Sequence, residues 1–368
     1  MISLLEQETP ISSSVPGRVP LSSTGKTALD VAKLACRQAG EVLVAHLGAV
    51  EHVKHKGVRD IQTDVDLMSE KLIKNMLNTE FPLDAVVTEE SAAQPGTSGY
   101  KWIIDPIDGT NNYFFGLPYF AINIALARDG DRGAQTPSFP RLRESRGGGE
   151  GVAADNRHYP ESTVLGVVPD PERVGLRDEP DYGGSFIVRG EPRFMTDSRV
   201  RGNPGGAGRA SANEEILLGV TYAPMLNELF WAEKGKGAFL NGRPIRVSAV
   251  EKLKDCLVSF DMGYNQDQGA KMIELAKTIW PRAHTLRLLG SGALGLAYVA
   301  CGRLGVYFHR SLYPWDVAPG ILLIQEAGGV VEAWGRQPIT LSSGNIVASS
   351  PVLMEEFHSV IAGSPFVA

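Results

Sequence analysis

The sequence contains little cysteine. Cys36, Cys256 and Cys301 are the only three in 368 residues, an odd number at wide spacings, with no Cys-x-x-Cys pair and no metal-ligand spacing. These features argue against a disulfide framework and against a cysteine-ligated metal site. The three side chains are most simply buried apolar residues in a reducing compartment, so we expect a cytoplasmic protein.

Long apolar runs and an excess of positive charge are also absent. Residues 1–26 mix Ser and Pro with Glu6 and Glu8 and have no continuous apolar segment, so we predict a disordered N-terminal arm and no secretory signal. The hydrophobic share of 43% and the charged share of 21% are ordinary for a globular protein, and nothing indicates a membrane. A net charge of −6 argues against a nucleic-acid-binding protein that depends on a broad basic surface.

Lysine is missing from one long stretch, between Lys101 and Lys234. Within that stretch, residues 131–213 are rich in Gly, Pro and Arg. Such a segment buries too little apolar surface to offset the entropy lost on ordering. We therefore predict a mostly disordered insertion in a surface hairpin, with candidate short strands over 164–168 and 185–188.

Carboxylates are present at the ends of predicted strands. The apolar run Tyr100–Ile104 ends in Asp105 and Asp108, which Pro106 and Ile107 separate. Two acids three positions apart across a stiff turn can point at one centre, and carboxylate oxygens are ligands that Mg²⁺ prefers. Repulsion between the acids is tolerable only with a cation or water between them. The alternative is a common Asp-Pro and Asp-Gly turn that only ends a strand.

The next three residues favour an anion beside that metal. Gly109 lets the backbone approach a ligand closely. Thr110 and Asn111 have side chains that cap a helix and leave its first N–H groups available to an anion. A divalent metal next to anion-binding amides is what phosphate chemistry requires.

Residues 102–112 as a whole resemble the first signature of the inositol monophosphatase family, the Mg²⁺-dependent, lithium-sensitive sugar-phosphate phosphatases. Trp315–Gly320, continuing to Glu326–Gly329, resembles the second signature, in the expected order. The resemblance implies an α/β (α+β layered) fold, an αβαβα sandwich, over everything except the arm and the insertion. It also implies a small phosphorylated substrate and a homodimer, and we expect neither nucleic acid nor membrane as a partner.

The resemblance further implies two or three Mg²⁺ ions per active site. Their ligands would be Glu89, Asp105, the Ile107 carbonyl, Asp108 and Asp316, with Asp105 shared between ions. Glu89 begins a Glu-Glu-Ser motif that matches the family, and Glu90 would support it. Read alone, the glutamate pair would be a solvated turn and Asp316 a helix N-cap.

The same resemblance places catalytic residues before the first signature. Asp66, in a Thr-x-x-Asp motif, would lie beside the attacking water with Thr110 as its partner. Lys56 would lie near the metals, although Lys54 could take that role. Read alone, residues 56–66 are a solvated loop that leads to helix-capping aspartates.

The resemblance also implies contacts with the substrate. The implied substrate-binding residues are Gly109, Thr110, Asn111, Gly290, Ser291, His309 and Arg310. The position of His309 contacts the leaving group and is often acidic in inositol phosphatases, so the histidine casts doubt on myo-inositol phosphate as the substrate. Arg310 could bind a second anionic group.

We predict a phosphomonoesterase that hydrolyses inositol monophosphate or a related small sugar or polyol phosphate by attack of a metal-activated water. Fructose 1,6-bisphosphate, histidinol phosphate and 3′-phosphoadenosine 5′-phosphate are alternative substrates on the same template. A non-catalytic binding protein that keeps the fold is the competing class.

Periodicity gives the element order. We predict helices over 27–47, from 65 to about 80, over 269–280, 292–300 and 317–327, and from 351. We predict strands over 85–88, 100–104, 121–127, 216–222, 228–233, 257–260, 286–289, 305–308 and 330–333, with 121–127 half-buried, and a further hairpin segment over 238–242. We assign residues 27–255 to an N-terminal metal-binding lobe and residues 256–368 to a C-terminal α/β lobe.

Overall fold

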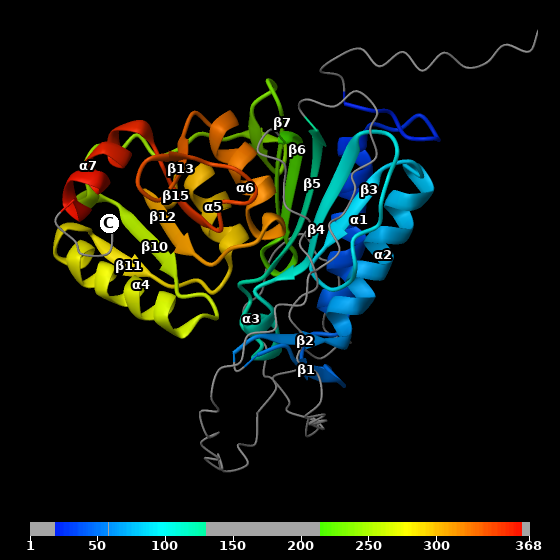
Figure 1. Ribbon diagram of the computed structural model, residues 1–368, viewed down its shortest axis with the longest axis horizontal. Coiled ribbons are helices and arrows are strands. Elements are labelled where there is room, and N and C mark those ends of the chain that lie inside the picture. Colours follow the sequence, from blue (N-terminus) through cyan, green and yellow to red (C-terminus); the bar gives the residue numbers. More distant parts are fainter. Residues whose placement is uncertain (1–18, 58, 130–213, 363–368) are drawn as a thin grey trace, which may run out of the picture.

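The computed structural model describes residues 19–57, 59–129 and 214–362, which form five stacked layers of alternating helices and sheets (Figure 1). One sheet has seven strands and the other has six. A pair of helices lies between the sheets, and another pair covers the outer face of each, so the predicted αβαβα sandwich is confirmed. The predicted insertion and its two candidate strands lie outside the described residues, as do residues 1–18 of the predicted arm.

Helices α1 (Ala28–Ala45) and α2 (Asp64–Glu80) cover the outer face of the seven-stranded sheet. Each begins at a threonine whose hydroxyl accepts a hydrogen bond from a backbone N–H in the first turn, Thr27 for α1 and Thr63 for α2. Their apolar faces are fully buried at positions such as Leu43 and Leu77. Tertiary burial and N-capping therefore agree with the periodicity of the sequence.

The seven-stranded sheet is antiparallel except for its first pair, which is parallel. In spatial order its strands are β3 (Ala85–Thr88), β4 (Tyr100–Asp108), β5 (Ala121–Asp129), β6 (Glu214–Ala223), β7 (Glu228–Glu233), β8 (Ala238–Leu240) and β9 (Arg243–Pro244). The prediction that β5 is half-buried is wrong, because residues 121–127 are buried on both faces. Ile and Leu face the outer helices while alanines alternate with them toward α6.

The middle layer consists of α5 (Gly292–Ala300) and α6 (Pro314–Glu326). Every residue of α5 is buried, as expected for a helix between two sheets. Close packing here depends on glycine: a Cβ on Gly219 of β6 would lie 2.6 Å from the Pro319 Cα of α6. Helix α6 therefore lies directly against the backbone of the sheet.

The six-stranded sheet has the order β11 (Thr285–Arg287), β10 (Leu257–Asp261), β12 (Val306–Arg310), β15 (Asn345–Ser349), β13 (Val330–Ala333) and β14 (Gln337–Pro338). Strand β10 is parallel to both of its neighbours, so their carboxyl ends meet at one edge. Strand β15, which is buried between β12 and β13, was not among the predicted strands. Helices α4 (Gln266–Ile279) and α7 (Pro351–Ile361) cover the outer face.

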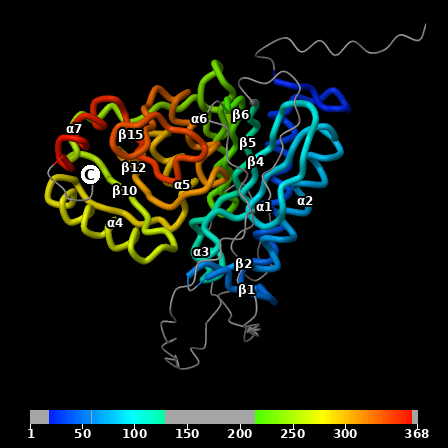
Figure 2. The backbone as a smooth tube through the Cα atoms, in the orientation of Figure 1, coloured from blue at the N-terminus to red at the C-terminus, as the bar shows by residue number. Residues whose placement is uncertain are grey.

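Smaller elements complete the described chain. Strands β1 (Val53–His55) and β2 (Ile61–Thr63) form a hairpin that lies, with α3 (Thr110–Phe114), at one end of the sandwich (Figure 2). Three 3₁₀ turns cover Pro224–Leu226, Leu253–Asp255 and Trp280–Arg282. The predicted lobe boundary at residue 255 stays a prediction.

The predicted disordered arm extends too far along the chain. Residues 19–26 have a defined position, because Lys26 Nζ and Thr24 Oγ1 both lie 2.6 Å from the Glu80 carboxylate at the end of α2. The backbone N–H of Ser23 also donates to the Glu80 carbonyl (2.8 Å). These polar contacts between distant segments are invisible to local composition.

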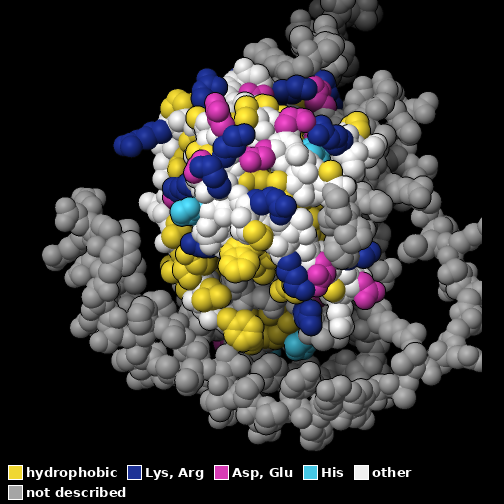
Figure 3. All heavy atoms as spheres, turned by 90° about the vertical axis from the view of Figure 1, so that its left-hand side faces the viewer, with side chains coloured by type: hydrophobic (Ala, Val, Ile, Leu, Met, Phe, Trp, Pro, Cys, Tyr) yellow, Lys and Arg dark blue, Asp and Glu magenta, His cyan; other side chains and the backbone are white. Residues whose placement is uncertain are grey.

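The surface charges, the helix lengths and the cysteine side chains can be compared with the predictions from composition. On the face formed by the outer helices of the six-stranded sheet, Lys and Arg side chains are interspersed with Asp and Glu, and hydrophobic side chains gather in the lower half (Figure 3). Among the described residues, no helix combines the length and the apolar character needed to cross a bilayer. All three cysteines are free thiols, two of them buried and Cys301 half-buried.

Candidate metal centre

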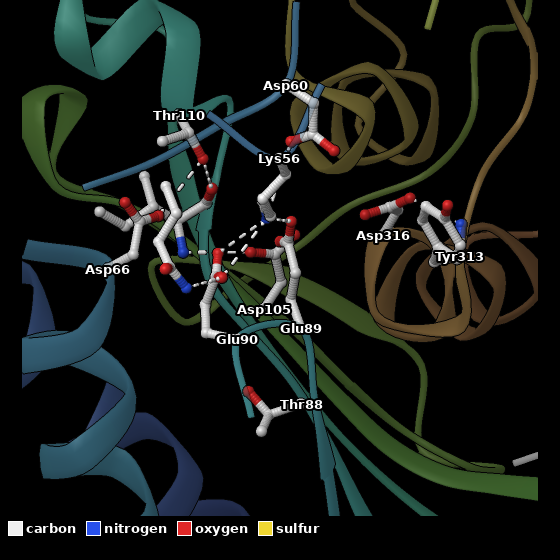
Figure 4. A network of polar contacts seen from close by, with 12 residues as sticks. Lys56, Asp60, Asp66, Thr88, Glu89, Glu90, Asp105, Thr110, Tyr313 and Asp316 are labelled. Carbon is white, nitrogen blue, oxygen red and sulfur yellow. Dashed lines mark hydrogen bonds and ion pairs between the residues drawn. The ribbon is translucent and has the colours of Figure 1, made fainter. Parts of the chain in front are cut away.

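The carboxylates of Glu89, Asp105 and Asp316 meet where β3, β4 and α6 come together (Figure 4), and Asp108 of β4 lies with them. Strands β3 and β4 are parallel, so Glu89, just after β3, lies beside Asp105 of β4. Asp316 approaches from the first turn of α6. Single carboxylate oxygens of Asp105, Asp108 and Asp316 all lie within 4.8 Å of one another. The structure therefore brings together the four acidic side chains predicted as metal ligands.

An irregularity in β4 explains how two acids three positions apart reach one centre. In a regular strand, Asp105 and Asp108 would point to opposite faces. Here Asp105 pairs with Asn123 and Asp108 with Ala121, so the register shifts by one residue between them. Ser69 of α2 fixes the bulged backbone by donating to the Pro106 carbonyl (3.0 Å). The strand thus continues through both acids, and the prediction that it ends at Ile104 is wrong.

Burial, together with repulsion between neighbouring acids, raises the pKa of every carboxyl group in this cluster. Burial, followed by repulsion from Glu89 and other acids, raises the pKa of Asp105 well above its ordinary value. Burial and Asp108 do the same to the pKa of Asp316, and burial raises the pKa of Asp108 to about 7. Carboxylate oxygens of Asp105, Asp108 and Asp316 lie within 4.8 Å of one another, and such proximity between acids is tolerable only with a proton or a cation between them.

The donor set fits a hard divalent cation. The converging atoms are carboxylate oxygens, and no histidine nitrogen or cysteine sulfur is among them in the described residues. Mg²⁺ is bound by such oxygen ligands. Its charge would offset the repulsion that raises these pKa values.

Lys56 contacts the cluster through Glu89 and its neighbour Glu90. Its Nζ is 2.5 Å from Glu89 Oε1 and 3.1 Å from Glu90 Oε1. Burial alone would lower the pKa of Lys56, but the two glutamates outweigh it and raise that pKa. Lys54, the alternative, is exposed on β1. The structure therefore places Lys56, not Lys54, against the metal-ligand candidates.

Asp66 and Thr110 form a second buried pair. Asp66 Oδ2 accepts hydrogen bonds from the Thr63 N–H (2.7 Å) and hydroxyl (2.5 Å), while Oδ1 lies 3.3 Å from Thr110 Oγ1. Thr110 Oγ1 also lies 3.0 Å from the Ile107 carbonyl, which links the pair to the metal-ligand candidates. Burial raises the pKa of Asp66 to about 7, so it can exchange a proton near neutral pH.

The start of α3 differs from the prediction. Its N-cap is Gly109, at φ 90°, and not Thr110 or Asn111, and the helix has only five residues. A Cβ on Gly109 would lie 3.0 Å from the Tyr119 carbonyl oxygen. This position therefore requires glycine both for its positive φ and for the close approach of the Tyr119 backbone. Asn111 donates to the Arg59 carbonyl (3.0 Å), which attaches α3 to the β1–β2 loop.

Asp316 also differs from the expected N-cap. Tyr313 is the N-cap of α6, and its backbone N–H donates to Asp316 Oδ2 (2.7 Å). Asp316 is the third helical residue and bonds back to the cap. This contact leaves the other oxygen of Asp316 available to the cluster.

Residues predicted to bind substrate are divided between two environments. Ser291, the N-cap of α5, donates a hydrogen bond from its hydroxyl to Asp108 Oδ2. The backbone N–H of the preceding residue, Gly290, donates to Asp261 Oδ1. His309 is 6% exposed, and its Nε2 faces Gly263 with no hydrogen-bond partner among the described residues. Burial lowers the pKa of His309 to about 3, so its ring is neutral. Arg310 lies over the Trp334 ring at 4.8 Å.

Sequence reasoning missed two polar residues beside this group. Asp261, at the end of β10, accepts hydrogen bonds from the Gly290 N–H (2.8 Å) and the Tyr307 hydroxyl (3.1 Å). The only sequence signal was an acid at the end of a predicted strand, the signal that identified Asp105. Tyr307 lies inside an apolar run and gave no signal.

Comparison with known proteins agrees with this geometry. The sequence profile of the inositol monophosphatase family matches residues 26–133 and 210–364. The chain belongs to the inositol monophosphatase family. Membership supports a phosphatase activity, and the interruption between the matched ranges falls on the predicted insertion.

Relatives in this family carry several names. The chain is 28% identical to the fructose-1,6-bisphosphatase/inositol-1-monophosphatase of Thermotoga maritima, covering 90% of this chain and 95% of the relative. It is 27% identical to inositol monophosphatase 1 of Solanum lycopersicum, covering 92% and 96%. It is 28% identical to the Nus factor SuhB of Salmonella typhimurium strain LT2, covering 88% and 91%.

Solved structures give the same fold. The extragenic suppressor protein suhB of Bartonella henselae superimposes with a TM-score of 0.65 at 27% identity, covering 91% of this chain and 98% of that structure. The Thermotoga maritima inositol monophosphatase gives a TM-score of 0.64 at 26% identity, covering 91% and 96%.

Proposed function

We propose that this protein is a Mg²⁺-dependent phosphomonoesterase that hydrolyses inositol monophosphate or a related small sugar or polyol phosphate. The observation that carries the proposal is the convergence of Glu89, Asp105, Asp108 and Asp316, four acids from three parts of the fold: the end of β3, strand β4 and helix α6. Water and protein hydrogen bonds alone would leave their charges poorly compensated. When bound there with the Ile107 carbonyl, Mg²⁺ supplies positive charge that activates a water and stabilises the departing oxygen.

In this proposal the chain's own residues handle the proton and the orientation of the water. Asp66, with its pKa raised to about 7 by burial, accepts the proton of the attacking water, and Thr110 orients that water through the hydroxyl that also bonds Ile107. Thr63 keeps the Asp66 carboxylate fixed through two hydrogen bonds. The positive charge of Lys56 partly neutralises the carboxylates of Glu89 and Glu90.

The substrate contacts are proposed with one restriction. Gly109, Asn111 and Gly290 line the approach to the acids in our assignment, and Arg310 remains the candidate for a second anionic group. His309 would need a shift of the Gly263 loop to reach a substrate, since its Nε2 lies under that glycine. In the described conformation His309 is therefore covered by Gly263 and is not available to a leaving group.

The test is phosphate release from a panel of substrates, each with Mg²⁺ and with EDTA. The panel contains inositol 1-phosphate, fructose 1,6-bisphosphate, histidinol phosphate and 3′-phosphoadenosine 5′-phosphate. We expect metal-dependent release from inositol 1-phosphate, reduced by about 10³-fold or more in Asp105→Asn. Release that persists in EDTA or in Asp105→Asn would contradict the metal assignment.

A non-catalytic role is the second candidate, since some relatives are named Nus factor rather than phosphatase. A missing metal ligand would favour it, and all the predicted acidic ligands are present at the site. Absence of phosphate release from the whole panel, in protein that is folded by circular dichroism, would favour this candidate. The absence of nucleic-acid partners and the cytoplasmic location stay predictions.

We also propose a homodimer and lithium inhibition, as expected for the family. Four exposed apolar residues come from two segments of the chain: Phe115, Leu117, Tyr119 and Leu288. Asn112 connects the two segments, because its side-chain amide donates hydrogen bonds to the backbone carbonyls of Tyr119 and Leu289. Such a patch is suited to a second copy of the chain. Light scattering should give twice the chain mass, and Leu288→Asp should halve it. A mass equal to that of one chain for the protein without this substitution would contradict the proposed dimer.

A further inference from the structure

Asp261 is a buried carboxylate that the proposed reaction does not use. It is 7% exposed and lies at the carboxyl end of β10, in the C-terminal part of the chain. Its two oxygens bind different partners: Oδ1 accepts from the Gly290 N–H (2.8 Å) and Oδ2 from the Tyr307 hydroxyl (3.1 Å). Burying a carboxylate costs free energy unless hydrogen bonds of this kind compensate for the lost water. We therefore asked what these two contacts of Asp261 hold in place.

The Gly290 contact leads directly to a metal-ligand candidate. The next residue, Ser291, is 2% exposed and donates from its hydroxyl to Asp108 Oδ2. The Ala293 N–H donates to the same oxygen (3.1 Å). Asp108 is therefore oriented by a short segment, residues 290–293, whose first backbone N–H is bound by Asp261.

This segment has little freedom to adjust. Gly290 has φ +68°, and a Cβ there would lie 2.9 Å from the Asn112 side chain. The Ser291 hydroxyl also accepts from the Leu294 N–H (3.2 Å), which caps α5. A shift of Gly290 would therefore move the Ser291 hydroxyl and the start of α5 together.

We propose that Asp261 is a positioning residue for the metal centre, which fixes the backbone at Gly290 and thereby the hydrogen bonds that orient Asp108. The inference rests on the proposed metal centre. Residues that hydrogen-bond to metal ligands typically change metal affinity by about 10- to 100-fold when removed. Asp261 acts one step further out, through Ser291.

The test is direct metal binding, measured as free Mn²⁺ by electron paramagnetic resonance, with no turnover required. Mn²⁺ takes the same oxygen ligands as Mg²⁺. We expect Asp261→Ala to weaken Mn²⁺ binding by about tenfold or more. Asp261→Asn keeps an oxygen that can accept from Gly290, so we expect affinity close to that of the unchanged protein. Loss as large in Asp261→Asn as in Asp261→Ala would assign the effect to charge and overturn the proposal.

Asp84 provides a matched control. It is also a buried aspartate, 5% exposed, and accepts two hydrogen bonds, from Ser98 Oγ (2.6 Å) and Trp102 Nε1 (3.0 Å), but it precedes β3 at the end remote from the acids. Asp84→Ala should lower the urea midpoint and leave Mn²⁺ affinity unchanged. Equal loss of affinity in Asp84→Ala would mean that general destabilisation explains Asp261→Ala, and the proposal would fail.

A second variant keeps the test valid if Asp261→Ala does not fold. Ser291→Ala should weaken Mn²⁺ binding by itself. Where Asp261→Ala folds, the losses in a double variant of Ser291→Ala with Asp261→Ala should not add, because both act through Asp108. Unchanged affinity in Ser291→Ala, or fully additive losses, would overturn the inference. If the unchanged protein binds no Mn²⁺, the proposed function itself fails, which distinguishes the two outcomes.

Discussion

Metal-free protein should lose stability as the pH rises from 6.5 to 8, the opposite of acid denaturation. Burial raises the pKa of Asp66 and of Asp108 to about 7, and the pKa of Glu90 to about 8. An unfolded chain releases these protons near pH 4, so in this range the folded state holds more protons than the unfolded state. Because stability falls with pH wherever the folded state binds more protons, the sign is negative.

The magnitude follows from the pKa values. Between pH 6.5 and 8, the free energy of unfolding should fall by about 1 kcal/mol for each of Asp66 and Asp108 and by about 2 kcal/mol for Glu90. His309, with its pKa lowered to about 3 by burial, contributes the opposite sign, but less than about 1 kcal/mol, because the unfolded histidine is already half neutral at pH 6.5. A fall of about 3 kcal/mol should lower the urea midpoint by about 1 M.

Urea unfolding in EDTA at several pH values measures this slope, and the same series in Mg²⁺ should reverse it. Metal binds only the deprotonated ligands, so Mg²⁺ stabilises more strongly as the pH rises. Asp66→Asn should reduce the EDTA slope by about 1 kcal/mol over this range. A midpoint in EDTA that is constant or that rises from pH 6.5 to 8 would refute the account of the acids as a charge-crowded site.

Three further predictions concern single parts of the fold. Thr110→Val removes the hydroxyl that bonds Ile107 and should lower the rate of phosphate release by about 10²-fold with Mn²⁺ affinity unchanged; a parallel loss of affinity would contradict the catalytic role. Gly219→Ala places a Cβ against Pro319 and should lower the free energy of unfolding by about 1–3 kcal/mol in urea, and a neutral effect would contradict the packing. Replacing residues 131–213 by a short turn should leave Mn²⁺ affinity intact, whereas a protein that binds no metal would show that this segment is needed.

Of the acidic ligands, only Asp105 and Asp108 gave a signal of their own, as two acids that follow an apolar run and lie three positions apart across a stiff turn. The family resemblance supplied Glu89 and Asp316, which read alone indicate a solvated turn and a helix N-cap. Parallel pairing then makes the meeting of Glu89 and Asp105 almost automatic. The resemblance supplied Asp66 and Lys56, whose own surroundings in the sequence indicate only a polar loop.

The supporting residues could not be predicted because their partners are distant in the sequence. Asp261 is 29 positions from Gly290, and Tyr307 is 46 positions from Asp261. The bulge in β4 depends on the register with β5, which no local pattern specifies. Strand β15 is five residues long, and only its pairing with β12 and β13 distinguishes it from a loop. Local propensity has no access to such contacts.

Strand β5 shows how the fold holds the second half of the metal centre while accommodating a long interruption. Asn123 is fully buried in β5, and its amide donates to the Trp315 and Asp316 carbonyls (3.2 and 3.3 Å), which docks the start of α6 against the sheet. This contact lies at the end of β5 where Ala121 pairs with Asp108. The opposite end pairs Asp129 with Glu214, the residues that flank positions 130–213. At about 3.3 Å per residue, roughly 25 Å of paired strand separates that junction from the acids. Variation in length at the junction can therefore leave the position of Asp316 unchanged.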